Sequence, residues 1–74
     1  MTSLPVVSGA TCIVALERIG YAVVRQKGSH VRLHCPGRPP VTVPLHDELD
    51  RGTLRAILRT AGVDPDDFRA LIAG

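Results

Sequence analysis

The chain has 74 residues, enough for one small domain that buries only roughly 60% of the surface of its unfolded form. Tyr21 and Phe68 are its only aromatic residues, which argues against an RNA surface made of several stacked rings. No apolar run approaches membrane-spanning length. Cys12 and Cys35 do not have the spacing of zinc ligands, and we expect no secretory leader, so both thiols should be reduced. We therefore expect a single cytoplasmic domain over residues 1–74, reduced and without membrane contact.

The net charge of +2 is unevenly distributed along the chain. Residues 1–46 carry five basic side chains against one acid, whereas residues 47–74 carry four arginines against six acids. The first part, with a net charge of +4, is therefore expected to face an anion. Ordinary solvated charges on exposed strands would explain the same distribution.

A first helix is predicted over residues 9–19. Ser8 is a good N-cap for it, and Gly20 is expected to end it at the position just after the helix. Cys12 and Leu16 recur at helical spacing and should form its buried face.

A β-hairpin is predicted next. β-branched residues favour a strand over residues 21–26, and Gly28 provides the turn. In the second strand, Val31 and Leu33 should face the core because side chains alternate between the two faces. The residues expected on the polar face of that strand are His30, Arg32 and His34.

A third strand is predicted over residues 41–46, after a proline-rich turn over residues 35–40. Val41 and Val43 alternate with polar residues, which is typical of a half-buried strand. Pro44 cannot donate a hydrogen bond to a neighbouring strand, so the third strand should lie at an edge of the sheet.

The last third of the chain is predicted to be helical. Apolar residues recur at i, i+3, i+4 and i+7 from Leu54 to Ala61, and Gly62 should end this helix. Asp64 and Pro65 are favourable first residues for a further short helix. The order is α-β-β-β-α with a terminal helical turn. It predicts an α+β domain whose helices cover one face of a three-stranded antiparallel sheet, while the other face keeps the histidines and arginines.

His30 is the candidate catalytic residue, because a histidine with a pKa of about 6.5 exchanges protons near neutrality. Such a base can remove the 2′-hydroxyl proton of RNA, so that this oxygen attacks the adjacent phosphorus without a metal. Gly28 permits a close backbone approach to a phosphate, Ser29 can position the turn, and Lys27 can neutralise charge on the phosphoryl oxygens. Further candidates for phosphate contacts are Arg25, Arg32, His46, Arg55 and Arg59.

Each of these residues also has a purely structural explanation. Gly28 and Ser29 are common in hairpin turns, in which case His30 is a solvated strand residue. His46 can be held by loop hydrogen bonds, and Arg55 and Arg59 can lie on a solvated helix face. The acidic residues at positions 47, 48 and 50 superficially offer metal ligands but more often serve a helix N-terminus, so no metal and no cofactor is expected.

Four segments together resemble the HicA toxins, small mRNA interferases with a double-stranded-RNA-binding-domain-like fold. They are residues 16–21 (LERIGY), 25–30 (RQKGSH), 41–46 (VTVPLH) and 52–58 (GTLRAIL). The segments occur in the order and spacing of that family, and the resemblance covers residues 4–71. It implies that His30 is the catalytic histidine, that the substrate is mRNA and that the partner is a HicB-type antitoxin.

We therefore expect a metal-independent endoribonuclease that acts on single-stranded or locally unpaired mRNA and is arrested by its antitoxin. Direct DNA binding by this chain alone is not expected. A non-catalytic RNA-binding module that grips phosphates is the alternative, and it differs by the absence of turnover. A protein-interaction domain without a role in RNA would show no salt-dependent RNA affinity.

Overall fold

The computed structural model of the protein describes residues 4–73. It is an α+β domain with the order α-β-β-β-α-α, as expected. The elements are α1 (Gly9–Glu17), β1 (Ala22–Lys27), β2 (His30–Cys35), β3 (Arg38–Pro44), α2 (Arg51–Ala61) and α3 (Pro65–Ala73). No helix within residues 4–73 has the length and apolar character needed to cross a membrane.

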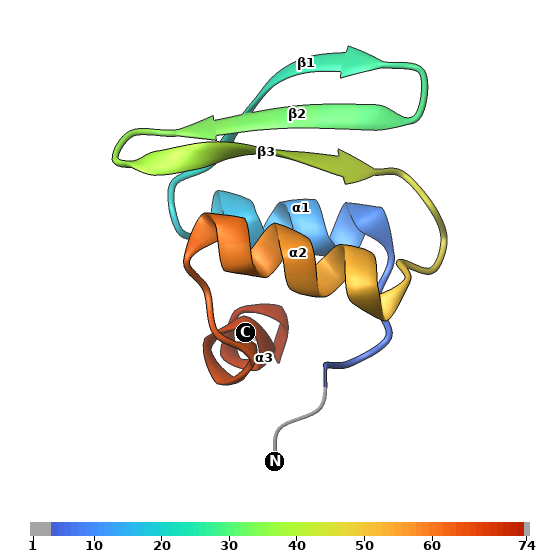
Figure 1. The fold of residues 1–74 in the computed structure, drawn as a ribbon, viewed down its shortest axis with the longest axis vertical. Helices are drawn as coiled ribbons and strands as arrows, with labels where there is room; N and C mark the ends of the chain where they lie inside the picture. Colours follow the sequence, from blue (N-terminus) through green and yellow to red (C-terminus); the bar gives the residue numbers. More distant parts are fainter. Residues whose placement is uncertain (1–3, 74) are drawn as a thin grey trace.

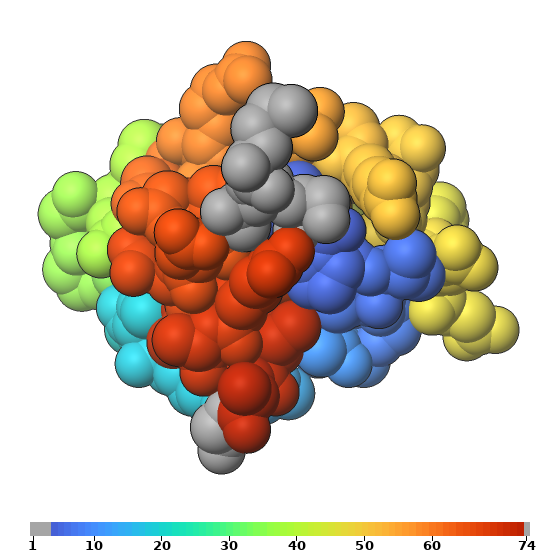
Figure 2. Space-filling model, turned by 90° about the horizontal axis from the view of Figure 1, so that it is seen from below, coloured from blue at the N-terminus to red at the C-terminus, as the bar shows by residue number. Residues whose placement is uncertain are grey.

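The three strands form one antiparallel sheet in the order β1-β2-β3, with α1 and α2 packed mainly on β3 (Figure 1). Helix α3 packs on α1 and forms the layer farthest from the sheet (Figure 1). Seen from that side, α3 lies beside the segment that precedes α1 (Figure 2). Strand β1 lies farthest from the helices, and all six of its residues are exposed.

The core lies between the sheet and the helices. The alternation predicted for β2 and β3 is confirmed, because Val31, Leu33, Val41 and Val43 are buried. They form one cluster with residues of all three helices; its largest fully buried side chains include Phe68, Leu16, Leu54 and Cys12. Burial of each such large aliphatic or aromatic side chain stabilises the fold by about 1.5–3 kcal/mol.

Two short turns connect the strands. Gly28 has a φ of 59°, and no residue other than glycine has a positive φ among those described, so Gly28–Ser29 forms a two-residue type II′ turn. Pro36 and Gly37, with φ 82° at the glycine, make the second turn by themselves. The predicted six-residue turn over residues 35–40 is therefore wrong, and β3 begins at Arg38.

Helix α1 ends earlier than predicted. It runs to Glu17 rather than to residue 19, and residues 18–20 form a turn. The backbone N–H of Tyr21 donates to the Leu16 carbonyl oxygen at 3.1 Å, which satisfies one of the free carbonyls at the helix end. Gly20 takes the positive φ, 107°, but lies two residues beyond the C-cap, Arg18.

The beginning of α1 lies very close to the end of β3. Ser8 caps the helix, its hydroxyl accepting a hydrogen bond from the Thr11 N–H at 3.0 Å, as predicted. Gly9 is buried, and its N–H donates to the His46 carbonyl oxygen at 2.9 Å. A Cβ atom at Gly9 would lie 2.0 Å from the Pro44 carbonyl oxygen, so only glycine permits this approach.

The ends of α2 and α3 follow the expected capping rules. Asp50 caps α2, its carboxylate accepting from the Gly52 and Thr53 N–H groups at 3.1 and 3.3 Å. Gly62 ends α2 in the left-handed conformation, φ 76°, as predicted. Asp64 caps α3 through the Asp67 N–H at 3.0 Å.

Candidate active site on the open sheet face

The strand register places His30 at the centre of a row of three residues on the face opposite the helices. Lys27 of β1 lies directly opposite His30 on one side, and Pro44 of β3 lies opposite it on the other. Directly opposed residues share a face with Cβ atoms about 4.5–5.5 Å apart. The His30 and Lys27 side chains are both exposed, so the imidazole and the ammonium groups can reach the same ligand.

The next row on this face is also basic. Arg32 of β2 lies opposite Arg25 of β1 and Thr42 of β3. The Arg32 guanidinium donates from Nη1 to Thr42 Oγ1 at 3.0 Å, which directs it across β3. The structure therefore brings Arg25, Lys27, His30 and the half-buried Arg32 onto one open surface, which we call the basic sheet face. His34 adds a second histidine one row farther along β2.

The hairpin turn borders this surface. A Cβ at Gly28 would meet no atom within 4 Å, so the turn is open to an approaching ligand. The Ser29 carbonyl oxygen accepts a hydrogen bond from the Leu45 N–H at 2.6 Å. This bond holds the segment that carries His46 beside the turn, and the His46 side chain is exposed there.

Arg55 and Arg59 do not join the basic sheet face. They lie on the side of α2 that borders a depression of about 280 Å³, together with Leu4 and Pro65. The side of α2 that faces β3 carries Ala56 and Thr60 instead. Arg55 and Arg59 are therefore separated from His30 by the body of the domain.

Sequence reasoning missed a third member of this arginine group. Arg51 stands four residues before Arg55, which in turn stands four before Arg59, and all three are exposed. Residues at i and i+4 are neighbours on a helix surface, so the three arginines form one stripe. The four-residue spacing of these arginines is visible in the sequence. Arg51 was missed because it lies before Leu54, where the apolar pattern that predicts the helix begins.

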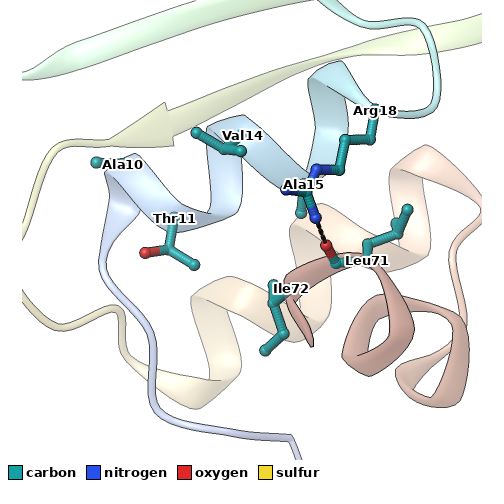
Figure 3. Close-up of a pocket in the computed structure, with 7 residues that line it drawn as sticks. All are labelled: Ala10, Thr11, Val14, Ala15, Arg18, Leu71 and Ile72. Atoms are coloured by element: carbon teal, nitrogen blue, oxygen red, sulfur yellow. Dashed lines mark hydrogen bonds between the residues drawn. The ribbon is translucent and has the colours of Figure 1, made fainter. Parts of the chain in front are cut away.

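Two other arginines hold helix ends rather than facing a ligand. The Arg38 guanidinium donates to the Ala61 carbonyl oxygen at 2.5 Å, and Arg18 donates to the Leu71 carbonyl oxygen (Figure 3). Cations are favourable at helix C-termini because free carbonyls and the helix dipole are negative there. Of the five basic residues in the first 46, three remain for the sheet face.

A pocket of about 230 Å³ between α1 and α3 is distinct from the basic sheet face (Figure 3). Its lining is mostly apolar, with Val14, Leu71 and Ile72 beside Thr11, and its single charged group is Arg18. That guanidinium is occupied by the Leu71 carbonyl. The pocket therefore offers no free charged group, and its one hydroxyl, Thr11 Oγ1, accepts a hydrogen bond from the Ser8 hydroxyl at 3.1 Å.

The two cysteines are free thiols. Cys12 is fully buried, and burial raises the pKa of its thiol to about 12, so it is protonated at neutral pH and serves as a core residue. Cys35 is partly exposed, with its Sγ 3.9 Å from the Ile19 carbonyl oxygen. Within residues 4–73, no three His, Cys, Asp or Glu side chains gather in a way that could hold a metal ion.

The comparisons with known proteins agree with this architecture. Residues 9–63 match the family model of the HicA toxin of bacterial toxin-antitoxin systems. The comparison with curated proteins found no match. The matched segment includes α1, the whole sheet and α2, and thus every residue of the basic sheet face. Because the match covers well over half of the chain, the protein belongs to the HicA toxin family of bacterial toxin-antitoxin systems.

Proposed function

We propose that this toxin is a metal-independent endoribonuclease that cleaves mRNA with His30 as its general base. The observation that carries the proposal is the row on the open sheet face in which exposed His30 lies opposite Lys27 beside the glycine turn. Cleavage through the 2′-hydroxyl uses a base to remove the hydroxyl proton and a cation to stabilise charge on the phosphoryl oxygens, and the open glycine turn leaves room for the phosphate. Membership of the toxin family supports an activity that harms the cell.

The proposed reaction needs one proton to be taken up and one to be supplied. His30 accepts the 2′-hydroxyl proton while the 2′ oxygen forms a bond to phosphorus, and the bond from phosphorus to the 5′ oxygen breaks. The products are a 2′,3′-cyclic phosphate and a 5′-hydroxyl, whose oxygen takes its proton from an acid. Lys27 and His46 are the two protonatable side chains that border the turn with His30.

Positive charge on the same face would hold the substrate. Arg25 and Arg32 form the row next to His30, so a phosphate beside the scissile one can contact either guanidinium. The Arg32 bond to Thr42 fixes one of these groups in advance. In this proposal the arginine stripe on α2 contacts a more distant part of the RNA or a partner, because it lies away from the sheet face.

Control of the enzyme would come from a second protein. No described segment covers the basic sheet face, so we propose a HicB-type antitoxin whose acidic groups cover His30 and the neighbouring cations in competition with RNA. We propose that the protein acts in the cytoplasm, where thiols stay reduced and where the toxin would encounter both mRNA and the antitoxin; its two free cysteines are consistent with this location.

The test compares His30→Ala with His34→Ala in RNA cleavage by the purified chain. Both histidines are exposed on the same face of β2, so each substitution should change stability by less than about 0.5 kcal/mol. Loss of a positioned base should slow cleavage by about 10²–10⁴-fold in His30→Ala, whereas His34→Ala should cleave normally. Thermal unfolding of both variants controls for the fold.

The outcomes separate the candidate functions. Normal cleavage by a folded His30→Ala variant would remove His30 from the mechanism. Salt-dependent RNA binding without cleavage by the wild-type chain would indicate the non-catalytic RNA-binding module instead. Equal losses in the two variants would contradict a specific role of His30 as the base.

A further inference from the structure

The two edges of the sheet differ in their ability to accept another strand. Strand β3 has seven residues, three of which are prolines at positions 39, 40 and 44 and have no N–H group. Its pairing with β2 also shifts register near Pro39 and Pro40, and α1 and α2 pack against it (Figure 1). Prolines and covering elements are the usual means of blocking an edge.

Strand β1 has none of this protection along its outer edge. Its six residues include no proline and are all exposed, and it lies farthest from the helices (Figure 1). Lys27 and His30 flank a two-residue type II′ turn and therefore exchange both of their backbone hydrogen bonds. The backbone N–H and C=O of the next residue, Gln26, must then point outward from the sheet.

The side chains of β1 indicate what could pair with it. Val23 and Val24 are 47% and 53% exposed, which is unusual for two adjacent valines in a strand of so small a domain. Arg25 and Lys27 share the open face of the sheet, and neither side chain forms a hydrogen bond or ion pair with any residue that the structure describes. The edge therefore combines free backbone donors, apolar contact area and two uncompensated positive charges.

We propose that β1 is a docking edge where an extended, acidic segment of a partner protein adds a fourth strand to the sheet. Backbone hydrogen bonds would provide affinity, and acidic side chains at every second position would face Arg25 and Lys27. The intervening apolar side chains would cover Val23 on the other face. The inference deepens the proposed function, since the partner that this edge fits is the inhibitory antitoxin.

The positive charges of Arg25 and Lys27 disfavour a second copy of this chain as the strand that pairs with the outer edge of β1. Pairing β1 with another β1 would bring two Arg25 and two Lys27 side chains together on one face, and like charges on neighbouring strands are destabilising. The basic residues that keep copies apart are those that attract an acidic segment.

An added strand would bring its acidic groups near the proposed catalytic residue. Strands lie about 4.7–4.9 Å apart, so a strand next to β1 is two strand spacings from His30, with Lys27 between them. Carboxylates there would pair with Lys27 and Arg25 and withdraw both cations from the RNA phosphates. Inhibition would then act through the cations, even when the imidazole itself is uncovered.

The test uses the full chain and a synthetic capped peptide of alternating glutamate and valine, measured by NMR and amide hydrogen exchange. The variant Gln26→Pro removes one outward N–H, which is tolerated on an edge strand. The matched control Gln26→Thr keeps that N–H and removes the same side chain. Two further peptides carry lysine in place of glutamate, or N-methyl groups that block one row of backbone donors.

We expect the glutamate peptide to bind the wild-type chain with a millimolar or lower Kd and to slow exchange of the Gln26 amide. Binding should weaken by about tenfold or more in Gln26→Pro and with the N-methylated peptide, and it should persist in Gln26→Thr. The lysine peptide should not bind. Unchanged binding to Gln26→Pro, equal binding of the lysine peptide, or no binding at millimolar concentration would each overturn the proposal.

Two further measurements complete the test. A dimer in sedimentation that dissociates in Gln26→Pro would overturn the acidic partner in favour of a second copy. RNA cleavage by the free wild-type chain, measured in the same preparation, tests the proposed ribonuclease function separately from the proposed docking edge. Peptide binding without cleavage would refute the proposed function alone, and cleavage without peptide binding would refute the docking edge alone.

Discussion

Substitution of Gly9 by alanine should destabilise the domain more than its single added methyl group suggests. The new Cβ would lie 2.0 Å from the Pro44 carbonyl oxygen, 3.0 Å from the Pro44 carbonyl carbon and 3.1 Å from Leu45 Cα. All three are backbone atoms, which cannot rotate away as a side chain could. Real Cβ atoms essentially never approach other atoms within 3.0 Å, so α1 and the end of β3 must separate by at least about 1 Å.

The expected cost has two parts. Forcing a methyl group into a packed contact typically costs about 1–3 kcal/mol. The same displacement stretches the bond from the Gly9 N–H to the His46 carbonyl, now 2.9 Å, and a lost hydrogen bond costs about 0.5–1.5 kcal/mol. The total is about 1.5–4.5 kcal/mol. For a domain of this size it should lower Tm by at least about 6 °C.

The assay is thermal and urea unfolding of Gly9→Ala beside Gly52→Ala as a control. At Gly52 the nearest atom to a new Cβ is Asp50 Oδ2 at 3.1 Å, which belongs to a side chain that can move. Gly52 also lies within α2, where alanine is favoured over glycine by about 1 kcal/mol. Unfolding of Gly9→Ala within about 1 kcal/mol of the wild-type free energy would refute the reasoning that this contact is rigid.

Three further predictions concern the reaction, the core and a helix end. RNA cleavage should continue in EDTA, should leave 2′,3′-cyclic phosphate ends and should stop when the 2′-hydroxyl at the cut site is removed; loss in chelator that magnesium restores would contradict this mechanism. Burial raises the pKa of Cys12 from 9.0 to about 12, so the protonated thiol stabilises the fold fully below pH 9 and progressively less as pH rises from 9 towards 12. The free energy of unfolding, measured in urea, should therefore fall between pH 8 and pH 10 by about 1.4 kcal/mol more in the wild-type chain than in Cys12→Ala. Arg38→Met should destabilise by about 1–2 kcal/mol because the Ala61 carbonyl loses its charged donor, whereas Arg59→Met should change the unfolding free energy little; equal effects would argue against the helix-end contact.

Features that depend on local periodicity could be predicted from the sequence. The alternation of Val31 and Leu33 against His30 specifies the buried and open faces of β2, and the structure confirms it. Gly62 ends α2 as expected because few other residues adopt the left-handed conformation found there. Each of these features is decided by the conformational preferences of a few neighbouring residues and does not depend on contacts with distant parts of the chain.

Features that depend on contacts between distant residues could not be predicted in this way. The extra residue at Val24 changes which β1 side chains face the open side, and it leaves Arg25 opposite Arg32. Arg38 counts in the sequence only as one of the five basic residues of the first part of the chain, and its contact with the Ala61 carbonyl, 23 residues away, could not be predicted. The sequence offers Arg55 and Arg59 as candidates for phosphate contacts but does not show that helix packing places them away from His30. The catalytic role of His30 stays a prediction.

The position of Phe68 has a consequence for where this domain ends as a folding unit. The family match stops at residue 63, but Phe68 belongs to α3 and is among the largest fully buried side chains. A fragment cut at the limit of the match would lack this ring and expose the apolar surfaces of α1 that α3 covers. The segment that identifies a family can thus be shorter than the segment that folds. For expression, isotope labelling or fusion to a carrier, the chain should therefore be kept through Ala73.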